Sequence, residues 1–358
     1  MLPVLILSID NSWSAMSMAN VSTRGRRLTS AKDVAKCAGV SVTTVSRVLS
    51  GHVEVIPKET QDRVTAAAAA LRYRPNFLAK ALRQGRTQTI GLIVPDISDA
   101  YFHQVARGVE DVAQAASHTV IIANTDRLQE KEQACVNLLL DKHVDGIIFA
   151  GGGVNNDSHL NDYDWEDIRV ITIGPHRLPF PAILVDDAAA ISAAMRHLAD
   201  IGCRRVLCLA GQPNWLITQR RLTGYHQAIA AGALDDDASL ILFGGFSHES
   251  GEKVTREALE HGTEFDGIVA FNDYAAIGAM QVLRAAGRRI PDDVAIVGCD
   301  DTPVAALVHP ALTSIRFPQY EFGRAAAQML LGQRPIDEKP LMFPHEVVER
   351  ESTMRRKL

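Results

Sequence analysis

The chain has 358 residues, of which 47% are hydrophobic and 22% charged, a composition typical of a globular protein and not of a disordered or fibrous one. This length allows two or three folded units. The net charge of −5 conceals an asymmetry, because residues 24–86 contain 13 lysines and arginines against 4 aspartates and glutamates, a local charge of +9, which leaves −14 for the rest. The basic segment favours a polyanionic partner, although a merely solvated surface is the alternative.

The five cysteines are odd in number, include no CxxC pair and lie mostly within apolar runs. They are typical of reduced, buried thiols in a cytoplasmic protein. The apolar opening of the chain, MLPVLILSI, is too short for a membrane span and lacks the features of a signal peptide. We therefore expect residues 1–27 to be a disordered extension, or the start of the sequence to be too early, with Met18 as the true initiator.

The first regular structure is predicted at residues 30–51, where signals for two short helices flank a glycine. Ser30 followed by Asp33 resembles a capping box, and an apolar stripe follows over about two turns. Gly39 allows the positive φ that ends this helix, and Ser41 is a good N-cap for a second helix through Leu49. Pro57 then opens a third, alanine-rich helix over residues 58–71.

The second helix has two different faces. Helical spacing turns Val45, Val48 and Leu49 inward, whereas Thr43 and Arg47 share the outer face. A slim polar helix end with one arginine suits entry into the DNA major groove, where arginine can bind guanine through two hydrogen bonds. Arg47 is therefore the predicted base-reading residue, and a solvated surface arginine is the alternative.

From residue 89 onward, short apolar strands alternate with helical stretches, which predicts parallel sheets covered by helices in two lobes. Ligands of open α/β sheets bind beyond the carboxyl ends of the strands. The polar residues at those ends are Asn124, Asn272 and Asp300. Asn272 could instead cap the helix that follows it, and Asp300 could be a turn residue.

The stretch SAKDVAKCAGVSVTTVSRVLSG resembles the N-terminal signature of the LacI family of bacterial transcription regulators. The resemblance continues in RYRPNFLAKALRQGRTQTIGLIVPDISDAYF, GIVAFNDYAAIGAM, AIVGCDDTPVA, LTSIRF and HEVVERES, and so covers about residues 28–353. It implies an N-terminal all-α helix-turn-helix DNA-binding domain with a hinge helix, followed by an α/β two-lobed domain like the periplasmic binding proteins, with parallel sheets. The implied boundaries are 28–74 for the DNA-binding domain, 75–86 for the hinge helix and linker, 87–353 for the effector-binding and dimerisation domain, and 354–358 for a tail.

For DNA recognition, the resemblance implies that Val42 and Thr43 select the operator while Arg47 contacts a guanine. Backbone phosphates would be reached by Ser41, Thr44 and Ser46. In the hinge, Asn76 matches a position that contacts the DNA backbone, and Leu82 matches a leucine that wedges between base pairs in the minor groove. An amphipathic linker packed on the next domain is the alternative for the hinge, which is too short to be a stable helix alone.

For the effector, the resemblance implies a cleft between the lobes lined by Tyr101, Phe102, Arg221, Phe246, Asn272 and Asp300. The strand-end argument adds Asn124 to these candidates. These side chains suit a polyhydroxylated ligand, because carboxylates and arginine take paired hydroxyls and an aromatic face covers a sugar ring. Phe246 could equally belong to the core, and Trp215 is a further candidate platform. Gly174-Pro175-His176 and Gln319 depart from the pattern of many sugar-responsive members, and the run Ala100-Tyr101-Phe102 resembles purine-responsive members. A sugar, a sugar acid or a purine therefore stays open as effector.

These observations predict a homodimeric repressor that binds a palindromic operator in double-stranded DNA under the control of a small molecule. A purine-dependent corepressor mechanism is the first alternative, and a sugar-binding transport protein is the second. We expect no enzyme activity, no cofactor, no metal and no membrane association, because the chain has no Walker loop, GxGxxG, GxSxG or metal-spaced His/Cys motif.

Overall fold

The computed structural model describes residues 29–74, 86–151 and 158–354. The chain divides into two compact units, one within residues 1–80 and the other within residues 81–358, which we describe separately. The predicted disordered extension, the hinge residues 75–85 and residues 355–358 of the tail lie outside the described residues.

The first unit contains three helices, α1 (Ala31–Ala38), α2 (Val42–Leu49) and α3 (Lys58–Ala70). Ser30 and Asp33 form the predicted capping box, in which the Ser30 amide donates to the Asp33 carboxylate over 2.9 Å. Gly39 ends α1 with a φ of +65°, a left-handed conformation that glycine adopts without strain. Val34, Val45 and Val64 are fully buried at the centre of the three helices. The predicted helix-turn-helix is therefore confirmed, and the third helix ends one residue earlier than expected.

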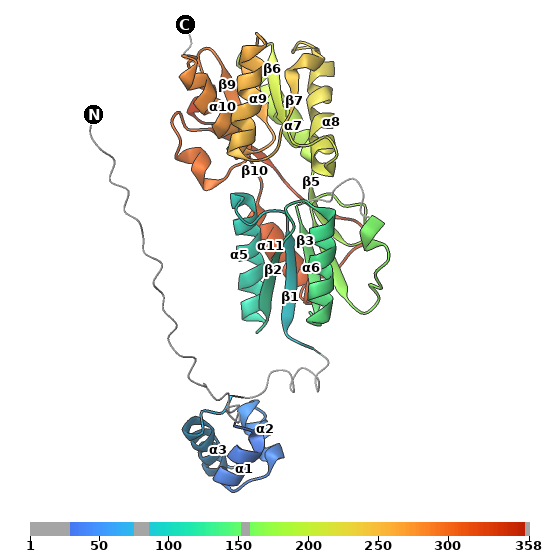
Figure 1. Ribbon diagram of the computed structural model, residues 1–358, viewed down its shortest axis with the longest axis vertical. Helices are drawn as coiled ribbons and strands as arrows, with labels where there is room; N and C mark the ends of the chain where they lie inside the picture. The colour runs from blue at the N-terminus through green and yellow to red at the C-terminus, as the bar shows by residue number, and fades with distance from the viewer. Residues whose placement is uncertain (1–28, 75–85, 152–157, 355–358) are drawn as a thin grey trace, which may run out of the picture. The chain divides into compact units, whose positions relative to one another are not determined.

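The second unit contains two lobes, each built on a six-stranded sheet covered by helices (Figure 1). The first sheet has the strand order β11-β5-β4-β3-β1-β2, and its pairs are parallel. Its strands are β1 (Thr89–Val94), β2 (Thr119–Asn124), β3 (Gly146–Ala150), β4 (Arg169–Ile173), β5 (Ala182–Val185) and β11 (Leu341–Phe343). The helices of this lobe are α5 (Ala100–Ala115), α6 (Gln129–Asp141) and α11 (Gln319–Leu330).

The second sheet has the order β12-β10-β9-β8-β6-β7. Its pairs are parallel except for β10 and β12, which are antiparallel. Its strands are β6 (Val206–Ala210), β7 (Ile241–Phe243), β8 (Gly267–Ala270), β9 (Ala295–Asp300), β10 (Thr313–Arg316) and β12 (Glu346–Val348). The helices of this lobe are α7 (Asp187–Asp200), α8 (Leu216–Ala230), α9 (His248–Glu260) and α10 (Asp273–Ala285).

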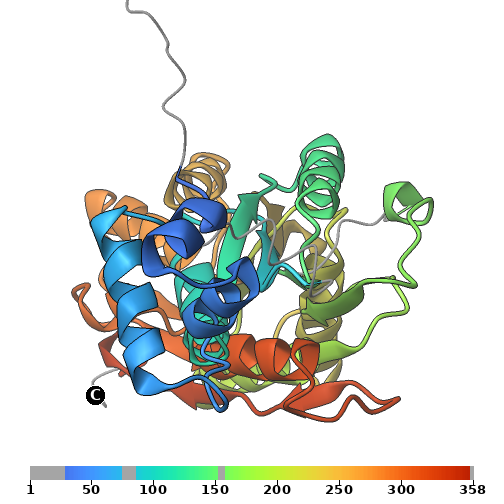
Figure 2. The same ribbon diagram turned by 90° about the horizontal axis from the view of Figure 1, so that it is seen from below.

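The two lobes share the chain, because it passes between them between β5 and α7, between β10 and α11, and between β11 and β12. After the second crossing α11 returns to pack against α5, β3 and β4 of the first lobe (Figure 2). Gly108 and Gly323 make the close approach of α5 and α11 possible, since a Cβ on either would collide with the backbone of the other helix. The predicted two-lobed α/β fold is confirmed, and its crossings place loops from both lobes beside one another.

Candidate functional site

The outer face of α2 is the first candidate site. Val42, Thr43 and Arg47 are exposed, whereas Val45 on the opposite side is fully buried. Among the residues that the structure describes, no carboxylate lies within ion-pair distance of the Arg47 guanidinium. The outward face that the sequence predicted is therefore present, with an arginine available to a partner.

The N-terminus of α2 places two hydroxyl groups together. The Ser41 side chain caps the helix by accepting from the Thr44 amide over 3.1 Å, and the two hydroxyls lie 2.9 Å apart. Ser46 is half-buried one turn further along the helix. A helix N-terminus carries partial positive charge and favours an anion. The other two predicted DNA contacts, Asn76 and Leu82, lie outside the described residues.

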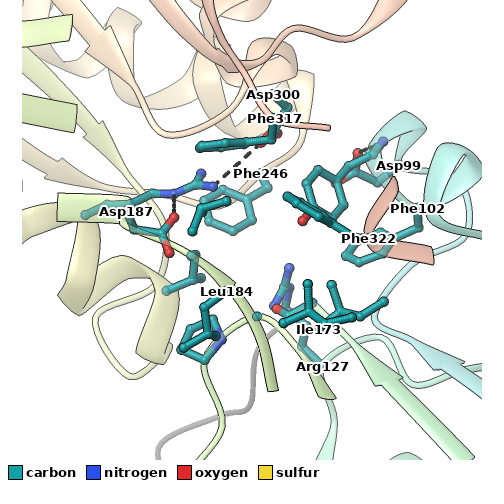
Figure 3. A pocket seen from close by; sticks show the side chains of 18 residues that line it. Asp99, Phe102, Arg127, Ile173, Leu184, Asp187, Phe246, Asp300, Phe317 and Phe322 are labelled. Atoms are coloured by element: carbon teal, nitrogen blue, oxygen red, sulfur yellow. Dashed lines mark hydrogen bonds and ion pairs between the residues drawn. The ribbon is translucent and has the colours of Figure 1, made fainter. Parts of the chain in front are cut away.

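The second candidate site is a cavity of about 50 Å³ between the two lobes (Figure 3). Loops at the carboxyl ends of the strands supply most of its walls, as expected for an open α/β sheet. Asp99 and Tyr101 follow β1, Asp187 follows β5, and Asp300 is the last residue of β9. The first and second chain crossings contribute Asp187 and Phe317. We call this space the interlobe cavity.

Arg221 of α8 is the centre of a buried charge cluster. Its Nε donates to the Asp187 carboxylate over 3.2 Å, and its Nη2 lies 3.6 Å from the Asp300 carboxylate (Figure 3). Its Nη1 also donates to the Phe271 carbonyl. Burial opposes the charge of Arg221, but the acidic groups around it raise its pKa above the ordinary value. Arg221 is therefore held as a cation between two carboxylates.

Both carboxylates of this cluster resist ionisation. Burial raises the pKa of Asp187, and it raises the pKa of Asp300 well above its ordinary value, in each case against the opposing charge of Arg221. Asp300 also has a φ of +107°, a conformation that side-chain-bearing residues rarely adopt. Such strain is concentrated at functional sites, and Asp300 lines the interlobe cavity.

Aromatic side chains cover other walls of the cavity. Tyr101 and Phe102 pack edge to face with ring centres 5.0 Å apart, and Phe246 lies half-buried across the cavity. Phe317 places its ring 5.6 Å from the Arg221 guanidinium. Five of the predicted effector residues, Tyr101, Phe102, Arg221, Phe246 and Asp300, therefore line one cavity. The arrangement offers carboxylate and guanidinium groups for hydroxyls and ring faces for C–H groups.

Two predicted residues do not line the cavity. Asn272 caps α10 by accepting from the Ala275 amide, and its side-chain nitrogen donates to the Phe246 carbonyl over 2.6 Å. The capping role left open for Asn272 is thus the one observed, and its contact with Phe246 is indirect support for the site. Asn124 is exposed and accepts from the Ile97 amide over 2.8 Å, so it fixes the loop after β1. Both are polar residues that follow or end a strand; α10 and the Phe246 carbonyl satisfy the side chain of Asn272, and the loop after β1 satisfies the side-chain oxygen of Asn124.

Other cavity residues were missed by sequence reasoning. Asp187 was visible as the second aspartate of AILVDD after a strand, and Asp99 as the cap of α5. Arg127, two residues beyond Thr125 in the loop after β2, places its guanidinium 4.5 Å from the Trp215 ring centre and 5.3 Å from that of Phe246. No local pattern distinguishes Arg127, because its neighbours come from the other lobe.

Two kinds of feature are absent from the described residues. No helix among them is long and apolar enough to cross a membrane. No three His, Cys, Asp or Glu side chains in the same residues are grouped so that they could hold a metal ion.

The chain matches two family descriptions that together cover both units. Residues 30–76 match the bacterial regulatory proteins of the lacI family, and residues 87–344 match the periplasmic binding proteins and sugar binding domain of the LacI family. The ribose operon repressor of Halalkalibacterium halodurans is 34% identical over 334 residues, which cover 91% of this chain and 97% of that protein. The regulator DegA of Bacillus subtilis is 35% identical over 329 residues, 90% of this chain and 97% of that one.

Solved structures agree with these sequence matches. The Lac repressor dimer bound to operator and the anti-inducer ONPF aligns with a TM-score of 0.82 at 25% identity, covering 91% of this chain and 99% of that one. A complex of the regulator CelR with cellobiose aligns with a TM-score of 0.68 at 28% identity, covering 90% and 99%. The chain belongs to the LacI family of bacterial transcriptional regulators and is not an enzyme.

Proposed function

We propose that the chain is a cytoplasmic repressor that binds a palindromic operator as a homodimer and responds to a small polyhydroxylated effector in the interlobe cavity. The observation that carries this proposal is the face of α2, where Val42, Thr43 and Arg47 are exposed on a helix whose other side is buried. Relatives named as operon repressors, and the operator-bound Lac repressor dimer, support it.

At the operator, α2 enters the major groove. Arg47 donates two hydrogen bonds to a guanine, and Val42 offers an apolar contact of the kind that a thymine methyl group accepts. Ser41, Thr44 and Ser46 contact phosphates at the helix N-terminus, where the helix dipole favours an anion. The hinge follows the family pattern, with Asn76 on the DNA backbone and Leu82 wedged in the minor groove. The domain boundaries predicted from the sequence are retained in this proposal.

A dimer is required for specificity. One three-helix unit buries too little surface and reads too few bases to select a single site in a genome. Two copies related by a twofold axis read two half-sites about one helical turn apart, or a multiple of it, which makes the operator palindromic.

The effector acts through the geometry of the two lobes. Hydroxyl groups of the ligand bind Arg221, Asp187 and Asp300, while Phe246 covers a C–H face. These residues belong to the second lobe, and Asp99, Tyr101 and Phe102 of the first lobe line the same cavity. A ligand that contacts both sets together favours one arrangement of the lobes. The coupling is reciprocal, since an effector that weakens operator binding is itself bound more weakly by the operator complex.

The experiment is selection of bound duplexes from random DNA by the full-length protein, followed by footprinting and measurement of mass in solution. We expect a palindromic site protected by a dimer. The same complex is then screened against sugars, sugar acids and purines for a change in operator affinity. A protein that stays monomeric and binds no duplex at low ionic strength would overturn the proposal. If only purines change the operator affinity, the effector is a purine and not a polyhydroxylated compound.

A further inference from the structure

Arg127 is the basic residue of the interlobe cavity that the cluster around Arg221 does not include. Its guanidinium lies against the rings of Trp215 and Phe246 from the second lobe, and its Nη1 donates to the Gly151 carbonyl over a long 3.4 Å. Within the described residues, no carboxylate lies within ion-pair distance of this guanidinium. Arg221, in contrast, has two carboxylate partners.

The surroundings of Arg127 make this unpaired charge costly. Burial lowers the pKa of Arg127 to about 10, against the opposing effect of Asp99. A cation that is partly removed from water loses hydration energy, which stacking on aromatic rings offsets only in part. An anion that met the guanidinium in the cavity would offset the remainder, because arginine pairs with carboxylates and phosphates through two parallel hydrogen bonds.

The position of Arg127 also suits a ligand contact. The interlobe cavity, at about 50 Å³, holds only a few water molecules. A groove of about 580 Å³ lies beside it and shares Asp99, Phe102, Arg127 and Phe246 as walls. A ligand of sugar size that uses Arg221 and Asp300 at the inner end therefore extends past Arg127 toward the groove.

We propose that the effector is a polyhydroxy acid whose single carboxylate is bound by Arg127 while its hydroxyl groups are bound by Asp187, Arg221 and Asp300. This inference rests on the proposed function and names the chemical class of its ligand. One guanidinium that has no acidic partner among the described residues matches one negative charge. A phosphate monoester, with close to two charges, would meet the three carboxyl groups of Asp99, Asp187 and Asp300, against which the described lining residues offer one cation without an acidic partner.

The test is calorimetric titration of the full-length protein with pairs of compounds that share hydroxyl groups and differ in charge. The pairs are gluconate with glucitol, galactonate with galactitol, and glucuronate with glucose; glucose 6-phosphate tests the phosphate. We expect at least one acid to bind about tenfold or more tightly than its neutral partner, the effect of a charge-assisted pair of hydrogen bonds. That preference should weaken with added salt.

Variants assign the preference to the residue. Arg127→Gln should remove the advantage of the acid, and Arg127→Lys, which retains the charge without the planar fork, should keep part of it. Lys142→Gln removes one positive charge from an exposed position on the same lobe and should change nothing. Thermal unfolding of each variant establishes that it folds. If Arg127→Gln does not fold, the comparison of acid and neutral ligands is made with Arg127→Lys.

The outcomes separate the two proposals. Equal affinity for an acid and its neutral partner, an acid preference that survives in Arg127→Gln, or tightest binding of the phosphate overturns the carboxylate assignment. If a neutral sugar binds as tightly as its acid and alters operator affinity, control by a polyhydroxylated effector is supported, and the proposal that Arg127 binds a carboxylate is overturned. If no sugar, acid or phosphate binds, both the polyhydroxylated effector and its carboxylate are overturned.

Discussion

The α2 face and the interlobe cavity use charged residues in opposite ways. On α2 the functional side chains are neighbours in sequence, within residues 41–47, and Arg47 is exposed without a described acidic partner. In the cavity the side chains come from residues more than 220 positions apart, Asp99 to Phe322, and Arg221 is buried between two carboxylates. The arginine of α2 is available to a binding partner, whereas Arg221 forms ion pairs within the protein and so stabilises the fold around the cavity.

This difference predicts how each site responds to substitution. Removing a solvated charge changes binding and leaves stability nearly unaltered, because water already satisfies the group. Removing one member of a buried cluster leaves the other members dehydrated and unpaired, so stability falls together with binding. The following substitutions test that contrast, from the largest expected effect to the smallest.

Arg221→Met should destabilise the second unit by about 3–5 kcal/mol, because Asp187 and Asp300 would stay buried without their cation. Burial already raises the pKa of both carboxyl groups. They therefore take up protons more readily in the folded variant than in the unfolded chain. The loss of unfolding free energy relative to the unsubstituted protein should shrink as the pH is lowered and grow as the pH is raised. Urea denaturation at several pH values measures both effects.

The matched control for this prediction is Arg196→Met on α7, an exposed arginine that donates to the Ser192 carbonyl. It should change the free energy of unfolding by less than about 0.5 kcal/mol. Equal stability of Arg221→Met and Arg196→Met would mean that the buried cluster does not stabilise the fold, and the contrast between the two sites would fail.

Arg47→Ala should weaken binding to the selected operator by roughly 1–3 kcal/mol and relax the preference at one base pair. The free energy of unfolding should stay unchanged, since no described residue pairs with this guanidinium. Electrophoretic mobility shifts on operator and on random duplexes measure the two affinities. Arg63→Ala removes an exposed charge from α3 of the same unit and serves as control. An equal loss on both duplexes for Arg47→Ala would contradict direct reading of a base.

The contrast between the two regions also explains what the sequence could predict. The ends of α1 and α2 follow from capping residues within three positions of each other, such as Ser30 with Asp33 and Ser41 with Thr44, so local chemistry determines them. Central strands are visible as apolar runs because both faces are buried. The strands β7, β11 and β12 were not predicted, because each is a three-residue, partly exposed edge strand without such a run. The internal strand β10 (TSIR) was also not predicted, because it contains a single aliphatic residue.

The cavity was predicted less completely than α2. Arg221 came from the resemblance to the family, whereas Asp300 came both from its place at a strand end and from the resemblance, and the structure places the two in one cluster. Asp187 was missed although it follows a strand, because its partner Arg221 lies 34 residues further along the chain. Arg127 was missed because it contacts Trp215 and Phe246 of the other lobe, which hydrophobic periodicity does not encode. Asn124 was expected in the site because it ends a strand, yet the adjacent loop takes its hydrogen bond.

Asp273, a buried carboxyl group outside the interlobe cavity, provides a further test of how burial affects a charged group. Asp273 is fully buried and accepts from the Thr302 amide over 2.6 Å and from the Ser314 hydroxyl over 2.5 Å. Burial, the largest influence, raises its pKa to about 7. The folded protein thus holds a proton that the unfolded chain releases near pH 4, and this contribution to stability is lost as the pH rises toward 7.

In the unsubstituted protein, the release of this proton should lower the free energy of unfolding by at most about 1.4 kcal/mol per pH unit between about pH 4 and pH 7. Asp273→Asn should abolish this decline. Urea denaturation of both proteins at half-unit intervals from pH 4.5 to 7.5 gives the difference. The deficit of the variant should be largest at low pH and should narrow as the pH rises. Parallel profiles would mean that Asp273 has the same proton affinity in the folded and unfolded states.

The smallest effect is expected at the exposed capping box of α1. Ser30→Ala removes the hydroxyl that caps the Asp33 amide, which should cost about 1 kcal/mol, while Ser30→Asp should retain the cap. Hydrogen exchange of the α1 amides measures the loss. Because the cap is a local device and not part of the α2 face, operator affinity at low temperature should be unchanged in both variants. Weaker operator binding without faster exchange would instead place Ser30 in contact with DNA, and it would extend the DNA-binding face beyond α2.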